Sequence, residues 1–401
     1  MKIFEYTVNF HHKINYRPSK GEYLLKKLVC IILCLAFLSL SAAAVSATDS
    51  APAVTISAPS AVLMHSSGEV LFEKNAHEKR PIASVTKVMT LLLVFEAIEC
   101  GNLSMADMVT GSAHAASMGG SQIWLEEGEK LSVEDMLKAV TICSANDCAV
   151  ALGEHISGSE DAFVALMNQR AAQLGMNDTT FKNACGLHEE GHLSSAYDVA
   201  LMSRELIRYG KVSEYATTWE ATLRGGESVL NNTNKMIRSY NGMTGLKTGF
   251  TTQAGYCLAA TATRENTGLI AVVLGGETSE KRNADISALL NWGFANYMSV
   301  IPTPDMPLMP VPVRLGKEKS VRIKLADTQG VLAQKGMEIT KNITLEKEVK
   351  APVKEGDRLG TLTAEQNGKV LCEIPIVAAE RVEKMSFWDV FLALLKTATM
   401  R

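Results

Sequence analysis

The strongest constraint on the fold is a set of three short polar motifs that lie far apart along the 401-residue chain. They are SVTK at residues 84–87, SAN at 144–146 and KTG at 247–249, in that order. Each motif alone is weak, because Ser, Lys and Gly are abundant residues. Together they supply a hydroxyl nucleophile, two amines and an amide, without any histidine. The chain is therefore expected to bring three distant segments to one cleft.

The first motif lies at the start of a predicted helix. Pro81 precedes an apolar run that ends at Gly101-Asn102, a pattern typical of a helix with start and stop signals. The run is apolar on nearly every face, which predicts a buried central helix. Ser84 and Lys87 share a helix face, so the Lys87 amine can take the proton of the Ser84 hydroxyl. The alternative is that Ser84 only caps the helix and Lys87 is a solvated residue.

The second motif follows another predicted helix, which begins with a capping box at residues 132–135. We expect Ser144 and Asn146 in a turn between two helices. There the Ser144 hydroxyl can relay a proton to the leaving amine, and the Asn146 amide can bond the substrate backbone with both its donor and its acceptor. Ser and Asn are also ordinary turn residues. A second Ser-x-Asn, at residues 239–241, lies too close to the third motif to form a separate wall of the cleft.

The third motif begins a run of strand-like segments that we predict to be antiparallel neighbours. These segments are residues 243–250, 256–261 and 269–274. On an edge strand, Lys247 projects into the cleft as a fixed positive charge, Thr248 offers a hydroxyl to a substrate carboxylate, and Gly249 lets substrate backbone approach. The backbone N–H groups of Ser84 and Phe250 form the candidate oxyanion hole. The alternative is a Thr-Gly turn with a surface lysine.

With these motifs, the chain from about Val54 to its C-terminus resembles the low-molecular-mass penicillin-binding proteins, specifically the serine-type D-alanyl-D-alanine carboxypeptidases. The resemblance also covers residues 80–83, 183–187, 192, 195–198, 245–246, 254–256 and 275–276. It implies an α+β domain of the β-lactamase/transpeptidase type, in which helices flank an antiparallel sheet. It further implies that the chain removes the terminal D-alanine from peptidoglycan stem pentapeptides through an acyl-enzyme on Ser84, which β-lactams also form. Arg282 matches an arginine that helps to hold the substrate carboxylate, and the resemblance implies no cofactor and no metal.

Several other functions fit parts of the sequence. Residues 188–192 match the H-E-x-x-H motif of zinc peptidases, but glycines bracket them and no convincing third ligand follows, so we expect a loop without metal. A class A-like β-lactamase needs a glutamate in an E-x-x-L-N segment, and residues 190–194 approach this pattern but end in serine. A DD-transpeptidase or endopeptidase, and a non-catalytic binder of peptidoglycan or β-lactams, remain alternatives that would use the same motifs.

The N-terminus has the features of an export signal. Two lysines precede an apolar run over residues 28–40, and small residues up to Ala47 offer cleavage sites; an uncleaved anchor is the alternative. Removal of residues 1–47 leaves 34 basic and 41 acidic side chains, a net charge of −7, which argues against nucleic acid as a partner. The six cysteines that remain are too dispersed for a disulfide framework.

We predict a catalytic domain over residues 48–299, a proline-rich linker over 300–312, a small β-sandwich-like domain over 313–382 and an amphipathic helix over 383–401. Short alternating segments with Gly-Asp and Asn-Gly turns predict the sandwich. The last segment is too short to span a bilayer, and its aromatic and leucine face suits the membrane interface. The alternative is a helix docked on the sandwich. The protein is accordingly expected to be exported and attached to the outer face of the cytoplasmic membrane.

Overall fold

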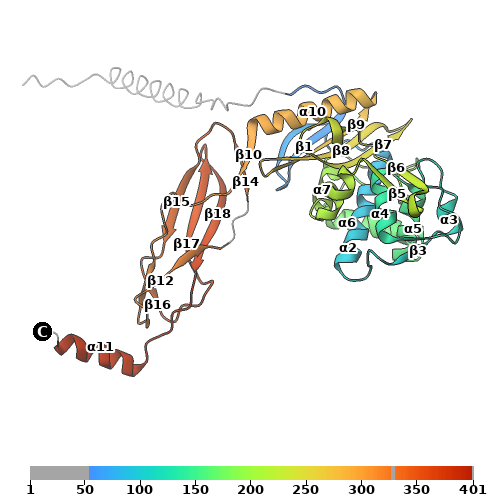
Figure 1. Ribbon diagram of the computed structural model, residues 1–401. Coiled ribbons are helices and arrows are strands. Elements are labelled where there is room, and N and C mark those ends of the chain that lie inside the picture. The colour runs from blue at the N-terminus through green and yellow to red at the C-terminus, as the bar shows by residue number, and fades with distance from the viewer. Residues whose placement is uncertain (1–53, 327–329, 400–401) are drawn as a thin grey trace, which may run out of the picture. The chain divides into compact units, whose positions relative to one another are not determined.

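The computed structural model describes residues 54–326 and 330–399. The export signal predicted for residues 1–47 therefore lies outside the described residues. The N-terminal part of the described chain contains a sheet with helices, and the C-terminal part is rich in strands (Figure 1). Within the described ranges, no helix combines the length and the apolar composition that crossing a bilayer requires.

A five-stranded antiparallel sheet, in the order β2-β1-β9-β8-β7, forms the centre of the N-terminal part. Its strands are β1 (Ser60–His65), β2 (Val70–Lys74), β7 (Met243–Thr251), β8 (Gly255–Arg264) and β9 (Thr267–Gly276). The three predicted strand segments fall within β7, β8 and β9, and β7 is an edge strand, as predicted. Glu265 and Asn266 both have positive φ, the geometry of a two-residue hairpin turn that matches the twist of the flanking strands. The sequence analysis did not identify β1 and β2.

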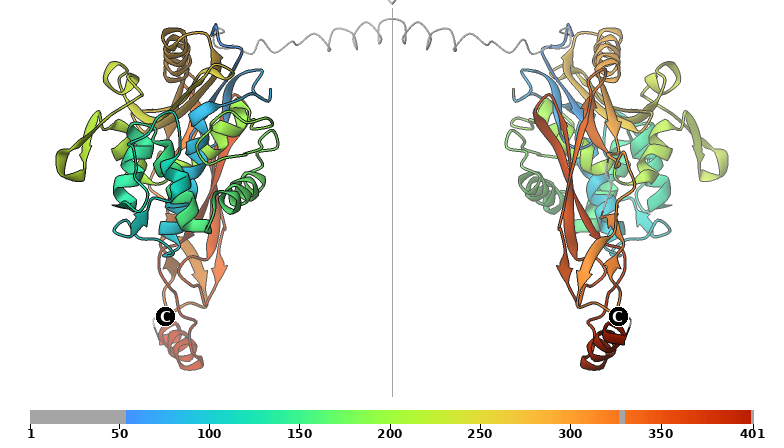
Figure 2. Two further views of the ribbon diagram at one scale, coloured as in Figure 1. Left: turned by 90° about the vertical axis from the view of Figure 1, so that its right-hand side faces the viewer. Right: turned by 90° about the vertical axis from the view of Figure 1, so that its left-hand side faces the viewer.

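The sheet separates two hydrophobic cores. Because side chains alternate along a strand, β9 sends Ile270 and Val272 into one core, and Ala271 and Val273 into the other. One core is closed by α10 (Ser279–Asn296), which lies along one face of the sheet (Figure 1, Figure 2). The helices of the other core are α2 (Lys87–Glu99), α4 (Val133–Ile142), α5 (Asn146–Ser157), α6 (Glu160–Gln173) and α7 (Ala196–Leu206).

Shorter elements surround this second core. They are β3 (Met108–Thr110), α3 (Ala113–Ala116), β4 (Lys130–Ser132), α8 (Gly210–Thr217), β5 (Glu220–Leu223), η2 (Arg224–Gly226), β6 (Ser228–Asn231) and α9 (Met236–Ser239). The predicted capping box is present in part, because the Ser132 hydroxyl accepts the backbone N–H of Asp135 at 3.1 Å and so begins α4.

The predicted central helix is buried, but it begins later than expected. A 3-10 turn, η1 (Ala83–Thr86), carries Ser84, and the α-helix starts only at Lys87. Ala83 has a φ of +49°, which interrupts α-helical geometry directly before Ser84. Gly101 ends the helix with a φ of +73°, as its position in the sequence indicates.

The C-terminal part is built almost entirely from strands, as predicted. A short strand β10 (Tyr297–Val300) pairs with β14 (Val331–Gln334), and residues 301–310, which hold most of the prolines of the predicted linker, contain no helix or strand. Two further sheets have the orders β12-β11-β16 and β13-β18-β17-β15 and small separate cores. Their strands are β11 (Val311–Arg314), β12 (Ser320–Val321), β13 (Ile323–Leu325), β15 (Thr340–Leu345), β16 (Val349–Lys350), β17 (Arg358–Gln366) and β18 (Lys369–Ala378). The helix α11 (Phe387–Thr399) follows.

One buried carboxylate fastens the segment before β1 to α10. Asp285 accepts the backbone N–H groups of Ser57 and Ala58, both at 2.8 Å, and the Ser57 hydroxyl at 2.9 Å. Removal of this acceptor would leave the N–H of the buried Ala58 without its partner.

We therefore expect Asp285→Ala to lower the free energy of unfolding by about 2–4 kcal/mol, because the N–H groups of Ser57 and Ala58 and the Ser57 hydroxyl lose a charged acceptor. Urea denaturation at pH 7 measures this value. Glu280→Ala is the matched control, since it removes an exposed carboxylate from the first turn of the same helix and should cost less than about 1 kcal/mol. Equal effects of the two substitutions would contradict the anchoring role of Asp285.

Candidate active site

The amine of Lys87 is the centre of the site. Its Nζ donates to Ser84 Oγ at 3.0 Å, to Asn146 Oδ1 at 2.5 Å and to the Cys185 carbonyl at 2.7 Å. Lys87 is completely buried, and burial lowers its pKa from 10.5 to about 8, because an ammonium ion loses hydration in the protein interior. Ser84 is half-buried and makes no capping bond to η1 or α2. The alternative of a capping serine and a solvated lysine is therefore wrong.

Two glycines allow other segments to close on the turn that carries Ser84. A Cβ on Gly249 would lie 2.8 Å from the Ile82 carbonyl oxygen and 3.0 Å from the Ser84 nitrogen. A Cβ on Gly186, whose φ is +84°, would lie 2.0 Å from the Ala83 carbonyl oxygen. Gly249 thus makes room for the nucleophile turn itself, in addition to the substrate backbone for which the sequence suggested it.

The second motif lies in the turn between α4 and α5, as predicted. Ser144 has a φ of +68°, and its buried hydroxyl has no hydrogen-bond partner among the described residues. Asn146 opens α5, where its Oδ1 accepts from Lys87 and its Nδ2 donates to the Gly119 carbonyl at 2.6 Å. The amide is therefore largely engaged with the enzyme, and one Nδ2 hydrogen remains for a ligand. The sequence analysis had expected both ends of the amide to serve the substrate.

Thr233 joins the second and third motifs. Its hydroxyl accepts from Thr248 Oγ1 at 2.8 Å, and its backbone N–H donates to the Ile142 carbonyl at the end of α4, at 3.1 Å. With the Lys87–Asn146 bond and the Gly249 contact on the Ser84 turn, these bonds bring all three motifs together.

Lys247 is buried, and its Nζ donates to the Thr248 carbonyl at 2.9 Å. Burial, followed by the nearby charge of Lys87, holds the pKa of Lys247 well below its ordinary value. Two buried ammonium groups near each other are unfavourable, so the charge on either amine opposes protonation of the other. Burial and the neighbouring Lys87 thus oppose the positive charge expected on Lys247, which stays a prediction.

Arg282 and Phe250 flank the third motif. Arg282 is buried in α10, where its Nη1 donates to the Cys257 carbonyl at 3.3 Å and its Nη2 donates to Asn283 Oδ1 at 2.9 Å. Its positive charge also helps to lower the pKa of Lys247, so the two groups interact electrostatically. The Phe250 side chain is exposed and packs on Tyr256 with ring centroids 4.4 Å apart.

Sequence reasoning missed three groups that hold the site together. They are the carbonyl groups of Gly119 and Cys185 and the hydroxyl of Thr233. A backbone carbonyl is present in every residue, so no side-chain pattern could have identified the first two. Thr233 carried no signal either, because a single threonine is an ordinary residue.

The H-E-x-x-H segment lies outside any helix, as expected. His192 is buried, its Nδ1 accepts the Lys182 N–H at 3.1 Å, and its Nε2 therefore donates to Thr86 Oγ1 at 2.8 Å. Burial lowers its pKa to about 4. Both ring nitrogens are thus engaged in hydrogen bonds, which connect residue 182 with Thr86 in the turn before α2. The described part of the chain holds no group of three His, Cys, Asp or Glu residues arranged for a metal ion.

Known proteins are similar to this chain in sequence and in architecture. Residues 45–278 match the family model of the D-alanyl-D-alanine carboxypeptidases, and residues 304–384 match the C-terminal domain of penicillin-binding protein 5. The D-alanyl-D-alanine carboxypeptidase DacF of Bacillus subtilis is 43% identical over 336 residues, which are 82% of this chain and 86% of that relative.

Solved structures agree. The crystal structure of penicillin-binding protein 5 from Haemophilus influenzae is 30% identical with a TM-score of 0.69, and the match covers 82% of this chain and 98% of that one. The ampicillin-bound penicillin-binding protein D2 of Listeria monocytogenes is 36% identical with a TM-score of 0.56, over 61% of this chain and 99% of that one. This chain therefore belongs to the D-alanyl-D-alanine carboxypeptidase family of serine peptidases.

Proposed function

We propose that this chain removes the terminal D-alanine from peptidoglycan stem pentapeptides through an acyl-enzyme on Ser84. The observation that carries the proposal is the buried Lys87 amine, 3.0 Å from the Ser84 hydroxyl and with a pKa lowered to about 8. A desolvated amine of this kind is a general base near neutral pH.

Acylation uses the groups in a defined order. The Ser84 hydroxyl oxygen attacks the carbonyl carbon of the penultimate D-alanine while Lys87 accepts its proton. The negative oxygen that develops lies toward the backbone N–H groups of Ser84 and Phe250, a role supported by the close approach of β7 to the Ser84 turn. The carbon–nitrogen bond then breaks, and the departing D-alanine amine takes the proton of the Ser144 hydroxyl, which has no partner among the described residues and regains a proton from the Lys87 ammonium. Water later attacks the ester and frees Ser84.

Recognition of the terminal carboxylate is assigned to Thr248 and Arg282. Thr248 presents its hydroxyl from the edge strand, and Arg282 contributes a positive charge that a carboxylate can pair with. Lys247 and the free Nδ2 hydrogen of Asn146 complete the polar lining. Peptidoglycan stem peptides and β-lactams, which imitate their D-Ala-D-Ala end, are accordingly the ligands of the site.

The β-lactamase alternative is not favoured. The glutamate of the near-match at residues 190–194 is exposed on a loop, whereas a deacylating water needs a carboxylate and an amide beside the acyl group. We therefore expect the penicilloyl ester to be hydrolysed slowly, so that penicillin acts as an inhibitor. Transpeptidation or endopeptidase activity would use the same acyl-enzyme with another acceptor or another amide.

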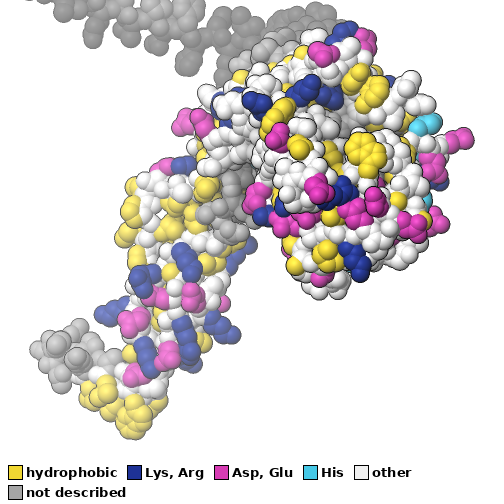
Figure 3. All heavy atoms as spheres, turned by 45° about the vertical axis from the view of Figure 1, so that its right-hand side comes forward, with side chains coloured by type: hydrophobic (Ala, Val, Ile, Leu, Met, Phe, Trp, Pro, Cys, Tyr) yellow, Lys and Arg dark blue, Asp and Glu magenta, His cyan; other side chains and the backbone are white. Residues whose placement is uncertain are grey.

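For localisation, we propose export and attachment to the outer face of the cytoplasmic membrane. The helix α11 exposes Phe387, Trp388, Phe391 and Leu392, and hydrophobic side chains gather at the lower end of the view in Figure 3. Apolar and aromatic side chains on one short helix suit insertion into the headgroup region. The export signal expected from the sequence of residues 1–47 supports a location on the outer face of this membrane.

The assignment of Ser84 predicts that Ser84→Ala lowers D-alanine release from a stem pentapeptide by at least about 1,000-fold, because the acyl-enzyme cannot form. Covalent labelling by penicillin should vanish as well, as mass spectrometry of the intact chain would show. The control is Ser239→Ala, which removes the exposed serine of the other Ser-x-Asn. A chelator should leave wild-type release unchanged. A penicillin adduct on another residue, or loss of activity with the chelator, would contradict the assignment.

The lowered pKa of Lys87 predicts a pH dependence. Only the neutral amine accepts a proton, and it predominates above a pKa of about 8. The second-order rate of acylation by penicillin should therefore rise about tenfold per pH unit between pH 6 and 7, and level off above about pH 8. Stopped-flow measurements with a fluorescent penicillin test this. A flat profile over that range would show that a proton transfer to this amine does not limit acylation.

The membrane proposal predicts that the chain lacking residues 1–47 binds vesicles of phosphatidylglycerol and phosphatidylethanolamine, and that truncation after Met385 abolishes binding. Phe391→Asp in the longer chain should weaken binding without altering penicillin acylation, because it places a charge on the apolar face. Vesicle co-sedimentation measures both. Binding that survives the truncation would favour a helix docked on the β domain.

A further inference from the structure

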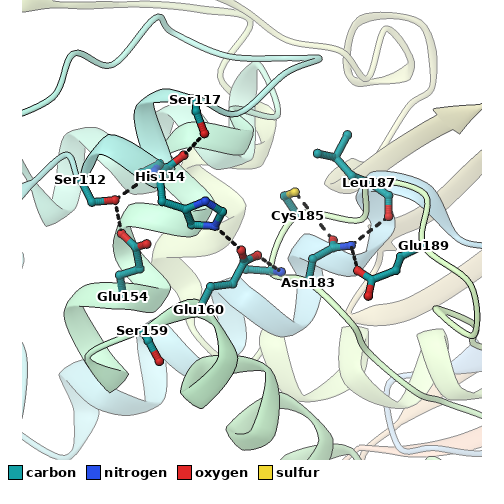
Figure 4. A network of polar contacts seen from close by, with 12 residues as sticks. Ser112, His114, Ser117, Glu154, Ser159, Glu160, Asn183, Cys185, Leu187 and Glu189 are labelled. Atoms are coloured by element: carbon teal, nitrogen blue, oxygen red, sulfur yellow. Dashed lines mark hydrogen bonds and ion pairs between the residues drawn. The ribbon is translucent and has the colours of Figure 1, made fainter.

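Two loops on the rim of the site supply the carbonyl groups that hold its amine and amide. The Gly119 carbonyl, in the loop after α3, accepts from Asn146 Nδ2, and the Cys185 carbonyl accepts from Lys87 Nζ. A network of polar contacts connects α3, which precedes the Gly119 loop, with the segment that contains Cys185 (Figure 4).

Glu160, in the first turn of α6, is the central member of this network of contacts. Its Oε2 pairs with His114 Nε2 of α3 at 2.7 Å, and its Oε1 accepts the backbone N–H of Ala184 at 2.8 Å (Figure 4). On the other side of the same residue, the Ala184 carbonyl accepts the Thr90 hydroxyl at 2.6 Å. Glu160 and Thr90 therefore fix the N–H and the carbonyl of Ala184, the residue directly before Cys185.

Asn183 stiffens the loop from within. Its Oδ1 accepts the Gly186 N–H at 2.7 Å, and its Nδ2 donates to the Leu187 carbonyl at 3.0 Å. Because these bonds make the segment compact, a shift of Ala184 would carry Cys185 and Gly186 with it. Gly186 lies against the Ala83 carbonyl, so such a shift would also reach the nucleophile turn.

We propose that Glu160 is a positioning residue for acylation, which orients the Ala184–Cys185 peptide so that its carbonyl holds Lys87 beside Ser84, and that His114 orients Glu160. This inference rests on the proposed function of Ser84 and Lys87. Glu160 acts through the loop and does not contact the reacting atoms.

The surroundings of both titrating groups fit this role. Glu160 and Asp161 of α6 and Glu154 of α5 face His114, and its pKa is raised, mainly by the hydrogen bond with Glu160, which favours the imidazolium donor. The titratable groups that face Lys87 are Cys143, Asp147, Cys185 and Lys247. Since burial is the main cause of its lowered pKa, a loosened 183–187 loop that admits water would return Lys87 toward its ordinary, protonated behaviour.

The test compares Glu160→Ala with Glu160→Gln in the full catalytic chain, by the rate of penicillin acylation between pH 6 and 10. Glu160→Ala should slow acylation at pH 7 about tenfold and move the midpoint of the profile up by about one pH unit, because a one-unit rise in the pKa of the base reduces its neutral fraction tenfold. Glu160→Gln keeps an amide oxygen for the Ala184 N–H and should stay within about threefold of wild type.

Asp161→Ala is the matched control. It removes an exposed carboxylate from the same first turn of α6, and thus costs the same helix-dipole stabilisation, yet should leave rate and midpoint unchanged. Should Glu160→Ala fail to fold, His114→Ala, at an exposed position, should shift the midpoint in the same direction by a smaller amount, and His114→Gln should restore it.

The outcomes separate this inference from the function on which it rests. A wild-type midpoint in Glu160→Ala, or Glu160→Gln as impaired as Glu160→Ala, overturns the positioning role. A wild-type chain that penicillin does not acylate at Ser84 overturns the proposed function instead.

Discussion

The structure depends on the burial of one amine. Lys87 has no access to water, so its hydrogens need acceptors from the protein, and these come from Ser84, Asn146 and Cys185 on three separate segments. The same burial lowers its pKa and makes it a base. Folding and chemistry therefore both require the three segments to pack around Lys87, since a misplaced segment would leave a hydrogen of the buried amine without an acceptor.

The remaining architecture keeps these segments close. The sheet has a core on each face, which fixes β7 at its edge, and Gly249 lets that strand pack against the nucleophile turn. Gly186 likewise allows the 183–187 loop to approach the Ala83 carbonyl of that turn. A side chain at either glycine would meet backbone atoms, which cannot move aside as a flexible side chain can.

Prediction from sequence succeeded where a pattern is local. Strand-like segments with a short connection identified β7, β8 and β9, and an unbroken apolar run identified α2 as a buried helix. It failed where tertiary contacts decide. The strand β1 lies between the two cores, as β8 and β9 do, and was nevertheless missed, and the positive φ of Ala83 directly before Ser84 has no sequence signature.

The sequence by itself determined which chemical groups are available and in which order along the chain: the Ser84 hydroxyl, the amines of Lys87 and Lys247, and the Asn146 amide. Only the tertiary structure decided their states. It buried both amines and so lowered their pKa values, left the Ser144 hydroxyl without a partner in the described part of the chain, and placed the Cys185 carbonyl against Lys87. The reason is physical: side-chain identity belongs to one residue, whereas solvation and backbone orientation arise from all the segments packed around it.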